Sequence, residues 1–256
     1  MAGPTAFVAA PRRTARVGGI MAVADVRDNV DRLAAGIDVN YVSEGCGFAK
    51  ATRSQCWGDT TGGDSPKTYD GIENGASVIQ SIIGYFGVKC FLEADEGAEE
   101  KRRATAGLDA GEGRFIEAAL IDWLDAAPAV TGAATLGETI GLLEDRADAP
   151  DADGYIGRPV LWLNRADAVL AFEASVLVAG PAGSGELWTP NGTPVIATAA
   201  VAPGDVYLTG DITVLRSVVT TNIALNPTVN QQMAIAERGY TVLVDCDYRA
   251  KSTVTA

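Results

Sequence analysis

Histidine is absent from this chain of 256 residues. Because histidine is the commonest acid–base group of enzymes and the usual base for a serine nucleophile, its absence disfavours hydrolytic triads. Cysteine is scarce, and the four cysteines form no C-x-x-C pair, so a zinc site is not predicted. We expect reduced, mostly buried thiols at Cys46, Cys56, Cys90 and Cys246. A bond between Cys46 and Cys56 stays an open alternative, since spacing alone does not establish one.

Positive charge and long apolar runs are lacking as well. The 20 Lys and Arg residues stand against 33 Asp and Glu, for a net charge of -13. This balance argues against a sequence-reading nucleic-acid binder, because phosphate contacts need clustered cations. No apolar run reaches the about 20 residues that span a bilayer, so we expect no membrane partner. Arg12, Arg13 and Arg16 follow a weakly apolar patch, the reverse order of a secretory signal, and we interpret them as part of a flexible arm rather than a transit peptide.

The run 157–248 has the composition of strands joined by tight turns. Apolar β-formers there are interrupted by Asn191-Gly192, Pro203-Gly204 and Gly210-Asp211, dipeptides that favour turns. The run carries no titrating centre at neutral pH. A segment this ordered and this poor in chemistry indicates a structural part rather than a catalyst.

The first third of the chain predicts an arm, a short helix, a long loop and a strand. Residues 1–20 lack periodicity, whereas apolar residues at three- and four-residue steps predict a helix over 21–35. Residues 44–75 are rich in glycine and too long for a bare loop inside a compact domain, so we expect either a mobile segment or an extended hairpin that something else covers. β-branched and aromatic residues over 76–94 predict a half-buried strand.

Helical patterns follow. Apolar residues predict a helix that ends before Pro128 and, if continuous over 93–125, is about 45–50 Å long. A second helix is predicted over 134–147 and a third over 166–177, with Asn164 as its N-cap. Strands and helices are mixed along the chain without a regular βαβ alternation, so the predicted fold class is α+β.

The motifs that carry chemistry elsewhere fail their tests here. The acidic turn 148–154 has Ala149 and Val160 where a calcium loop needs oxygen ligands, so we interpret it as an Asp-Gly turn. Ser184 lies in a loose likeness of a nucleophile elbow but has no histidine base. Gly111 and Gly113 lack the third glycine of a dinucleotide site. We predict no catalytic, cofactor-binding or metal-ligating residues, and no enzyme, although paired carboxylates stay open as an alternative.

Three of the tryptophans offer a ligand platform as an alternative to core packing. Core packing is the default for large aromatic residues, and we expect it for Trp123, Trp162 and Trp188.

The order of elements, together with the segments GELWTPNGTPVI, DVYLTGDITVLRS and NQQMAIAERGYTVLVDCD, resembles the major capsid proteins of tailed bacteriophages with the Hong Kong 97-type fold. The Ala- and Asp-rich composition resembles that of proteins from phages of high-GC actinobacteria. The resemblance implies an N-terminal arm (1–40), an extended loop with its flanking strand (41–92), a spine helix with the peripheral domain (93–154), and an axial domain with returning peripheral strands (155–256).

The same resemblance implies self-assembly into hexamers and pentamers of an icosahedral shell around double-stranded DNA. The expected partners are further copies of the chain, the packaged DNA without sequence specificity, and portal or decoration proteins. The expected location is the virion, after synthesis in the cytoplasm of a host bacterium. Alternatives are an encapsulin-type compartment shell, a minor head protein, and a monomeric β-rich ligand-binding module.

Overall fold

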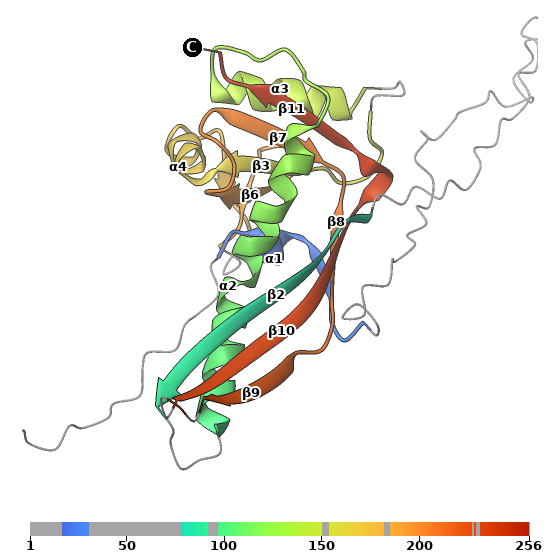
Figure 1. The fold of residues 1–256 in the computed structure, drawn as a ribbon. Helices are drawn as coiled ribbons and strands as arrows, with labels where there is room; N and C mark the ends of the chain where they lie inside the picture. Colours follow the sequence, from blue (N-terminus) through green and yellow to red (C-terminus); the bar gives the residue numbers. More distant parts are fainter. Residues whose placement is uncertain are drawn as a thin grey trace, which may run out of the picture.

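The computed structural model describes residues 17–30, 78–91, 97–149, 154–181, 185–226, 228 and 231–255. Figure 1 shows an elongated molecule, with a long helix and a long ribbon of strands reaching away from a more compact end. The helices of the described residues are α1 (Ile20–Val23), α2 (Ala98–Asp125), α3 (Leu136–Ala147) and α4 (Arg165–Glu173). The strands are β1 (Asp25–Arg27), β2 (Val78–Phe91), β3 (Val160–Asn164), β4 (Val178–Ala179), β5 (Leu187–Trp188), β6 (Pro194–Thr198), β7 (Asp205–Thr209), β8 (Ile212–Arg216), β9 (Thr220–Asn226), β10 (Gln231–Val244) and β11 (Arg249–Thr253).

The strands form two sheets, which we call the elongated sheet and the compact sheet. The elongated sheet has the order β1-β8-β10-β2, with β9 pairing the first half of β10. Its spine is the antiparallel pair β2–β10, in which each strand has 14 residues. The compact sheet has the order β11-β7-β3-β6-β5-β4. The predicted α+β class is therefore confirmed.

Helix α2 has 28 residues and is therefore about 42 Å long at 1.5 Å per residue. This length lets it run from the tip of the elongated sheet to the compact end. It packs along β2 and β10 of the elongated sheet, and its second half reaches the compact end (Figure 1). Gly107 lies where the helix comes close to the sheet: a Cβ atom there would stand 2.4 Å from ring atoms of Phe86. The predicted long helix is confirmed over Ala98–Asp125, with Gly97 in the left-handed conformation (φ 78°) just before it.

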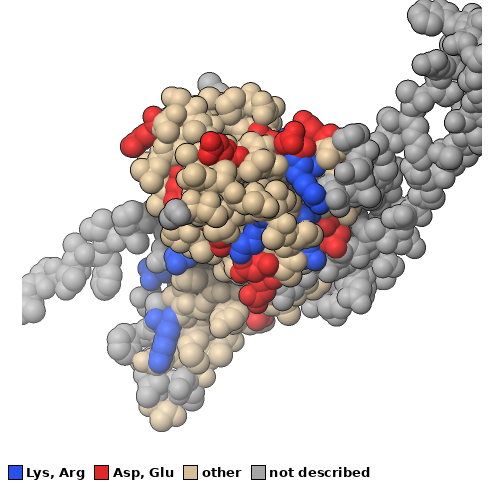
Figure 2. Space-filling view, turned by 90° about the horizontal axis from the view of Figure 1, so that it is seen from above, with Lys and Arg blue, Asp and Glu red and all other residues tan. Residues whose placement is uncertain are grey.

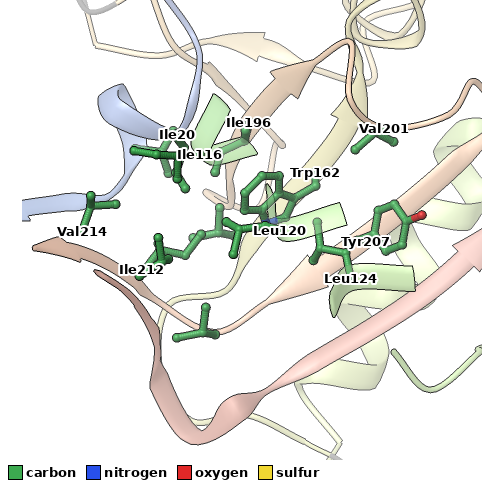
Figure 3. Packing of buried hydrophobic residues seen from close by; sticks show 14 of the residues in the cluster. Ile20, Ile116, Leu120, Leu124, Trp162, Ile196, Val201, Tyr207, Ile212 and Val214 are labelled. Carbon is green, nitrogen blue, oxygen red and sulfur yellow. The ribbon is translucent and has the colours of Figure 1, made fainter. Parts of the chain in front are cut away.

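The central strands of the compact sheet, β3, β6 and β7, are buried on both faces. Side chains of β3 alternate: Val160 and Trp162 join the core cluster with α1 and α2, whereas Leu161 and Leu163 join the cluster with α3 and α4. A strand that is buried on both faces needs apolar side chains at successive positions, and VLWLN has this pattern in its first four residues. Figure 3 shows Trp162 packed among aliphatic side chains from α2 and the neighbouring strands.

Several predicted elements need correction. The helix expected over 21–35 ends at Val23, and Asp25–Arg27 instead pair in parallel with Thr213–Leu215, because sheet pairing outweighs the helical spacing of apolar residues. Residues 18–27 belong to the body rather than to a free arm, since Ile20 is fully buried in the core and β1 pairs with β8. Helix α4 ends at Glu173 instead of Leu177, because Ser175 takes a left-handed φ of 59°.

Other predicted elements are confirmed. The strand expected over 76–94 is β2, the helix expected over 134–147 is α3, and Asn164 caps α4 by accepting a hydrogen bond from the amide of Ala166 at 2.8 Å. Gly192 and Gly204 have positive φ in the turns before β6 and β7. The loop predicted over 44–75, and the arginines at 12, 13 and 16, lie outside the described residues.

Candidate functional site

The described residues contain no group of three or more His, Cys, Asp or Glu side chains that could hold a metal ion. Two motif residues, Asp151 and Ser184, lie outside the described part of the chain, so their interpretation stays a prediction. Cys246 corrects the expectation of reduced thiols: it is disulfide-bonded, and its partner is not among the described side chains. Cys46 and Cys56 likewise lie outside the described residues.

The environments of Trp123, Trp162 and Trp188 favour packing over a ligand platform. Trp162 is fully buried, and its Nε1–H donates to Oγ1 of Thr209 at 3.1 Å. Trp123, on α2, has the guanidinium of Arg249 at 4.6 Å from its ring centroid. Trp188, on β5, donates to Glu186 at 3.1 Å. Trp123 also packs at the edge of the core cluster that contains Trp162, so core packing accounts for both residues.

A network of charges joins the middle of α2 to the elongated sheet. The nearly buried carboxylate of Glu112 (7% exposed) accepts hydrogen bonds from Arg216 of β8, and from Arg238 and Tyr240 of β10, the last two at 3.0 Å. Arg216 also donates to Asp28 at 2.6 Å, and this hydrogen bond lowers the pKa of the Asp28 carboxyl. Burial and the neighbouring Glu112 raise the pKa of the Tyr240 hydroxyl. One glutamate therefore ties two strands, β8 and β10, to the long helix.

A second network fastens the end of α2 to the compact sheet. Lys251 of β11 donates to Asp125, the last residue of α2, at 2.8 Å and contacts Asp205 of β7 at 3.3 Å. The hydroxyl of Tyr207 donates to the same Asp125 carboxylate at 2.5 Å. Burial, reinforced by that acceptor, raises the pKa of Tyr207 to about 12. The hydrogen bond from Lys251 lowers the pKa of Asp125.

A third polar cluster fixes the predicted turn at Asn191-Gly192. Glu144 of α3 accepts hydrogen bonds from Thr189 at 2.6 Å, Asn191 at 2.8 Å and Thr193 at 2.6 Å. The sequence predicts the turn but carries no signal for this carboxylate, which lies 45 residues before Thr189. All three networks hold elements in place, and none aims a nucleophile or base into a cavity.

Large apolar side chains are exposed on two surfaces of the described residues. On α4 the usual pattern is inverted: the small residues Ala168 and Ala171 face the core, while Val169, Leu170 and Phe172 are 54%, 62% and 47% exposed. The second surface is the face of the β2–β10–β9 ribbon that lies opposite α2, where Ile83 and Tyr85 are 63% and 69% exposed. Contiguous exposed apolar groups mark interaction sites in soluble proteins.

The charge distribution gives no hint of a nucleic-acid groove on the visible face. On the face seen in Figure 2, acidic and basic side chains are interspersed rather than gathered into a basic patch. No helix within the described residues is both long and apolar enough to cross a membrane.

Comparisons with solved structures identify the fold. No family model and no curated protein matches the chain. Solved structures do match. The capsid of an empty GTA particle aligns with a TM-score of 0.58 at 11% identity, covering 100% of this chain and 96% of that one. A structure from Mycobacterium phage Che8 aligns with a TM-score of 0.53 at 13% identity, covering 98% and 96% of the two chains. The capsid of a native GTA particle aligns with a TM-score of 0.51 at 10% identity, covering 100% and 96%. The described part of the chain thus has the Hong Kong 97-type capsid fold.

Proposed function

We propose that this protein is the structural subunit of an icosahedral shell, the major capsid protein of a double-stranded DNA phage, and that it is not an enzyme. The observation that carries the proposal is a capsid fold that leaves large apolar side chains exposed on α4 and on the ribbon. A protein that works as a monomer has no use for such surfaces, whereas a subunit that contacts several copies at once needs them.

The two sheets support a division of labour within the subunit. The compact sheet, with α3 and α4, would form the axial part that meets its copies around a symmetry axis. The elongated sheet and α2 would form the peripheral part, to which β8–β10 return late in the chain. The arm and the extended loop, predicted over 1–40 and 41–92, would add contacts between neighbours.

The partners follow from the same assignment. Copies of the chain would form hexamers and pentamers, and portal or decoration proteins would join them. The net charge of -13 would let DNA fill the shell without adhering to its wall, because like charges repel. The protein would act in the virion after synthesis in the cytoplasm of a host bacterium.

The test is assembly of the purified chain. Electron microscopy and light scattering on freshly expressed protein are expected to show closed shells or rings of hexamers. A monomer whose size does not change with concentration would contradict the proposal. Shells that enclose protein cargo instead of nuclease-protected DNA in infected cells would favour a compartment shell over a phage capsid.

A further inference from the structure

The turn between β5 and β6 carries Asn191-Gly192, a dipeptide that is chemically labile. In such a pair the backbone nitrogen of the glycine attacks the side-chain carbonyl carbon of the asparagine. A succinimide ring forms and ammonia leaves, and water then opens the ring to aspartate or isoaspartate. Glycine favours the attack because it has no side chain to block the approach. Both residues are exposed to solvent, so water reaches the site.

The attacking nitrogen is held by the hairpin itself. Pro190, Asn191 and Gly192 form a three-residue loop, which the amide of Thr189 closes by donating to the carbonyl of Thr193 at 2.9 Å. Gly192 has a left-handed φ of 91°, as such a loop requires at its third position. The N–H of Gly192 donates to the carbonyl of Thr189 at 3.0 Å. This hydrogen bond has to break before the nitrogen can lose its proton and attack.

The side chain that would be attacked is held by Glu144 of α3. Asn191 Nδ2 donates to Glu144 Oε2 at 2.8 Å. The other oxygen, Oε1, accepts hydrogen bonds from the hydroxyls of Thr189 and Thr193, both at 2.6 Å. These two threonines are the buried ends of the loop, 1% and 5% exposed. One carboxylate thus fixes both the base of the loop and the asparagine side chain within it.

Charge opposes the reaction as well. Negative charge develops on the attacking nitrogen and on the amide oxygen as the ring closes. Glu144 places a carboxylate next to that amide, and like charges at hydrogen-bond distance disfavour this development. The reacting atoms also have to align at about 3–3.5 Å, and the hydrogen bonds on Asn191 and Gly192 resist the rotation that this alignment needs.

We propose that Asn191-Gly192 is a deamidation site that Glu144 keeps in check. Opening of the turn frees the pair to react, and the reaction is not reversed when the turn closes. The product places a second carboxylate against Glu144 where a donor stood, and isoaspartate also adds a methylene group to the loop backbone. An opening of the turn is in this way recorded as a permanent change in the β5–β6 hairpin. The inference concerns the folded chain and does not rest on the proposed shell.

Peptide mapping after incubation at mildly alkaline pH measures the reaction, because the acid and isoaspartate products differ from the amide in mass and retention. The chain has a second Asn-Gly pair, Asn74-Gly75, which serves as a reference within each sample. Native wild-type protein is expected to deamidate at Asn191 at least about ten-fold more slowly than the isolated peptide 185–197. Glu144→Ala is expected to raise the rate at Asn191 at least about ten-fold and to leave the rate at Asn74 unchanged.

Two further variants separate the role of Glu144 from a general loss of structure. Glu144→Gln keeps one acceptor oxygen without the charge and is expected to give an intermediate rate. Asp145→Ala removes the exposed carboxylate beside Glu144 on α3 and is expected to leave the rate as in wild type. Circular dichroism checks that each variant folds, and if Glu144→Ala does not, the rate of Glu144→Gln decides.

Three outcomes overturn the inference. Wild-type protein that deamidates at Asn191 as fast as the peptide shows that the folded turn gives no protection. Variants of Glu144 that match wild type show that its carboxylate plays no part. A rate that rises equally at Asn191 and Asn74 assigns the effect to unfolding of the chain. None of these outcomes bears on shell assembly, which electron microscopy of the wild-type sample measures separately.

Discussion

The amide of Ile20 donates a hydrogen bond to the carboxylate of Glu117 at 2.9 Å, and both residues are fully buried. They lie 97 positions apart, so this bond anchors the first described helix to the middle of α2. The carboxylate also has a further interaction within the structure. The N-terminal segment is held by a polar contact in an otherwise apolar core.

Removing that acceptor is expected to destabilise the fold. Glu117→Ala leaves the buried amide of Ile20 without a partner, at a cost of about 1–3 kcal/mol in the free energy of unfolding. Glu117→Gln keeps a carbonyl acceptor and is expected to lose less. Urea denaturation followed by circular dichroism measures both. The control Asp122→Ala, on the exposed side of the same helix, is expected to change the free energy by less than about 0.5 kcal/mol; equal losses at the two positions would count against the anchor.

The charge network at Glu112 is expected to be more costly to break. Glu112→Ala leaves Arg216, Arg238 and the Tyr240 hydroxyl around a partly buried void, and breaking a buried ion pair from one side costs about 3–5 kcal/mol. Thermal unfolding of the variant measures the loss. Asp109→Ala, which removes a more exposed partner of Arg238 one turn earlier, is expected to cost at most about 1 kcal/mol.

Two glycines of α2 make a matched pair. At Gly107 a Cβ atom would stand 2.4 Å from the Phe86 ring, whereas at Gly111 nothing lies within 4 Å. Gly107→Ala is therefore expected to destabilise by about 1–3 kcal/mol through overpacking. Gly111→Ala is expected to stabilise by about 0.5–1 kcal/mol, because alanine loses less backbone entropy in a helix. Melting temperatures decide the point, and stabilisation by both substitutions would show that α2 does not approach the sheet this closely.

The contact between Asp125 and Lys251 predicts a dependence on pH. The folded-state pKa of Asp125 lies below its ordinary value of 3.8, so its charged form adds stability that is complete above that value and is lost as the pH falls through the lowered pKa. We expect Asp125→Asn to be less stable than wild type from pH 7 to about pH 5, by at most about 1 kcal/mol because the pair is half exposed, with the gap closing below about pH 4.

Thermal unfolding of both proteins across this range measures the gap. Asp122→Asn serves as the control and is expected to show no such closure. A gap at Asp125 that stays constant down to pH 3 would assign the effect to packing rather than to charge.

Much of the fold follows from local patterns. The stripe of Ile116, Leu120 and Leu124 predicts α2, the β-branched and aromatic residues over 76–94 predict β2, and Asn164 marks the start of α4. Each signal depends on neighbours within a few residues, which is why sequence reasoning finds it. The segment Asp25–Arg27 shows the opposite case: its apolar spacing favours a helix, but pairing with β8, far along the chain, makes it a strand.

The contacts that tie the molecule together carry no such local signal. Glu112 and Glu117 look like solvent-facing members of an acidic helix, yet they are the buried acceptors of groups on other elements. The sequence also does not predict which side of α4 is exposed. Three large apolar residues in a helix ordinarily indicate its core face, but in α4 they face outward.

The amino-acid sequence by itself determined the class of the protein: an acidic, histidine-free α+β chain with a long helix and a strand-rich end, and a resemblance to capsid subunits. Only the tertiary structure decided which carboxylates are buried, which large apolar side chains stay exposed, and in which register β2 pairs with β10. The reason is physical. Periodicity is a property of neighbouring residues, whereas burial and register arise when strands separated by more than a hundred residues pair, and no local pattern encodes that pairing.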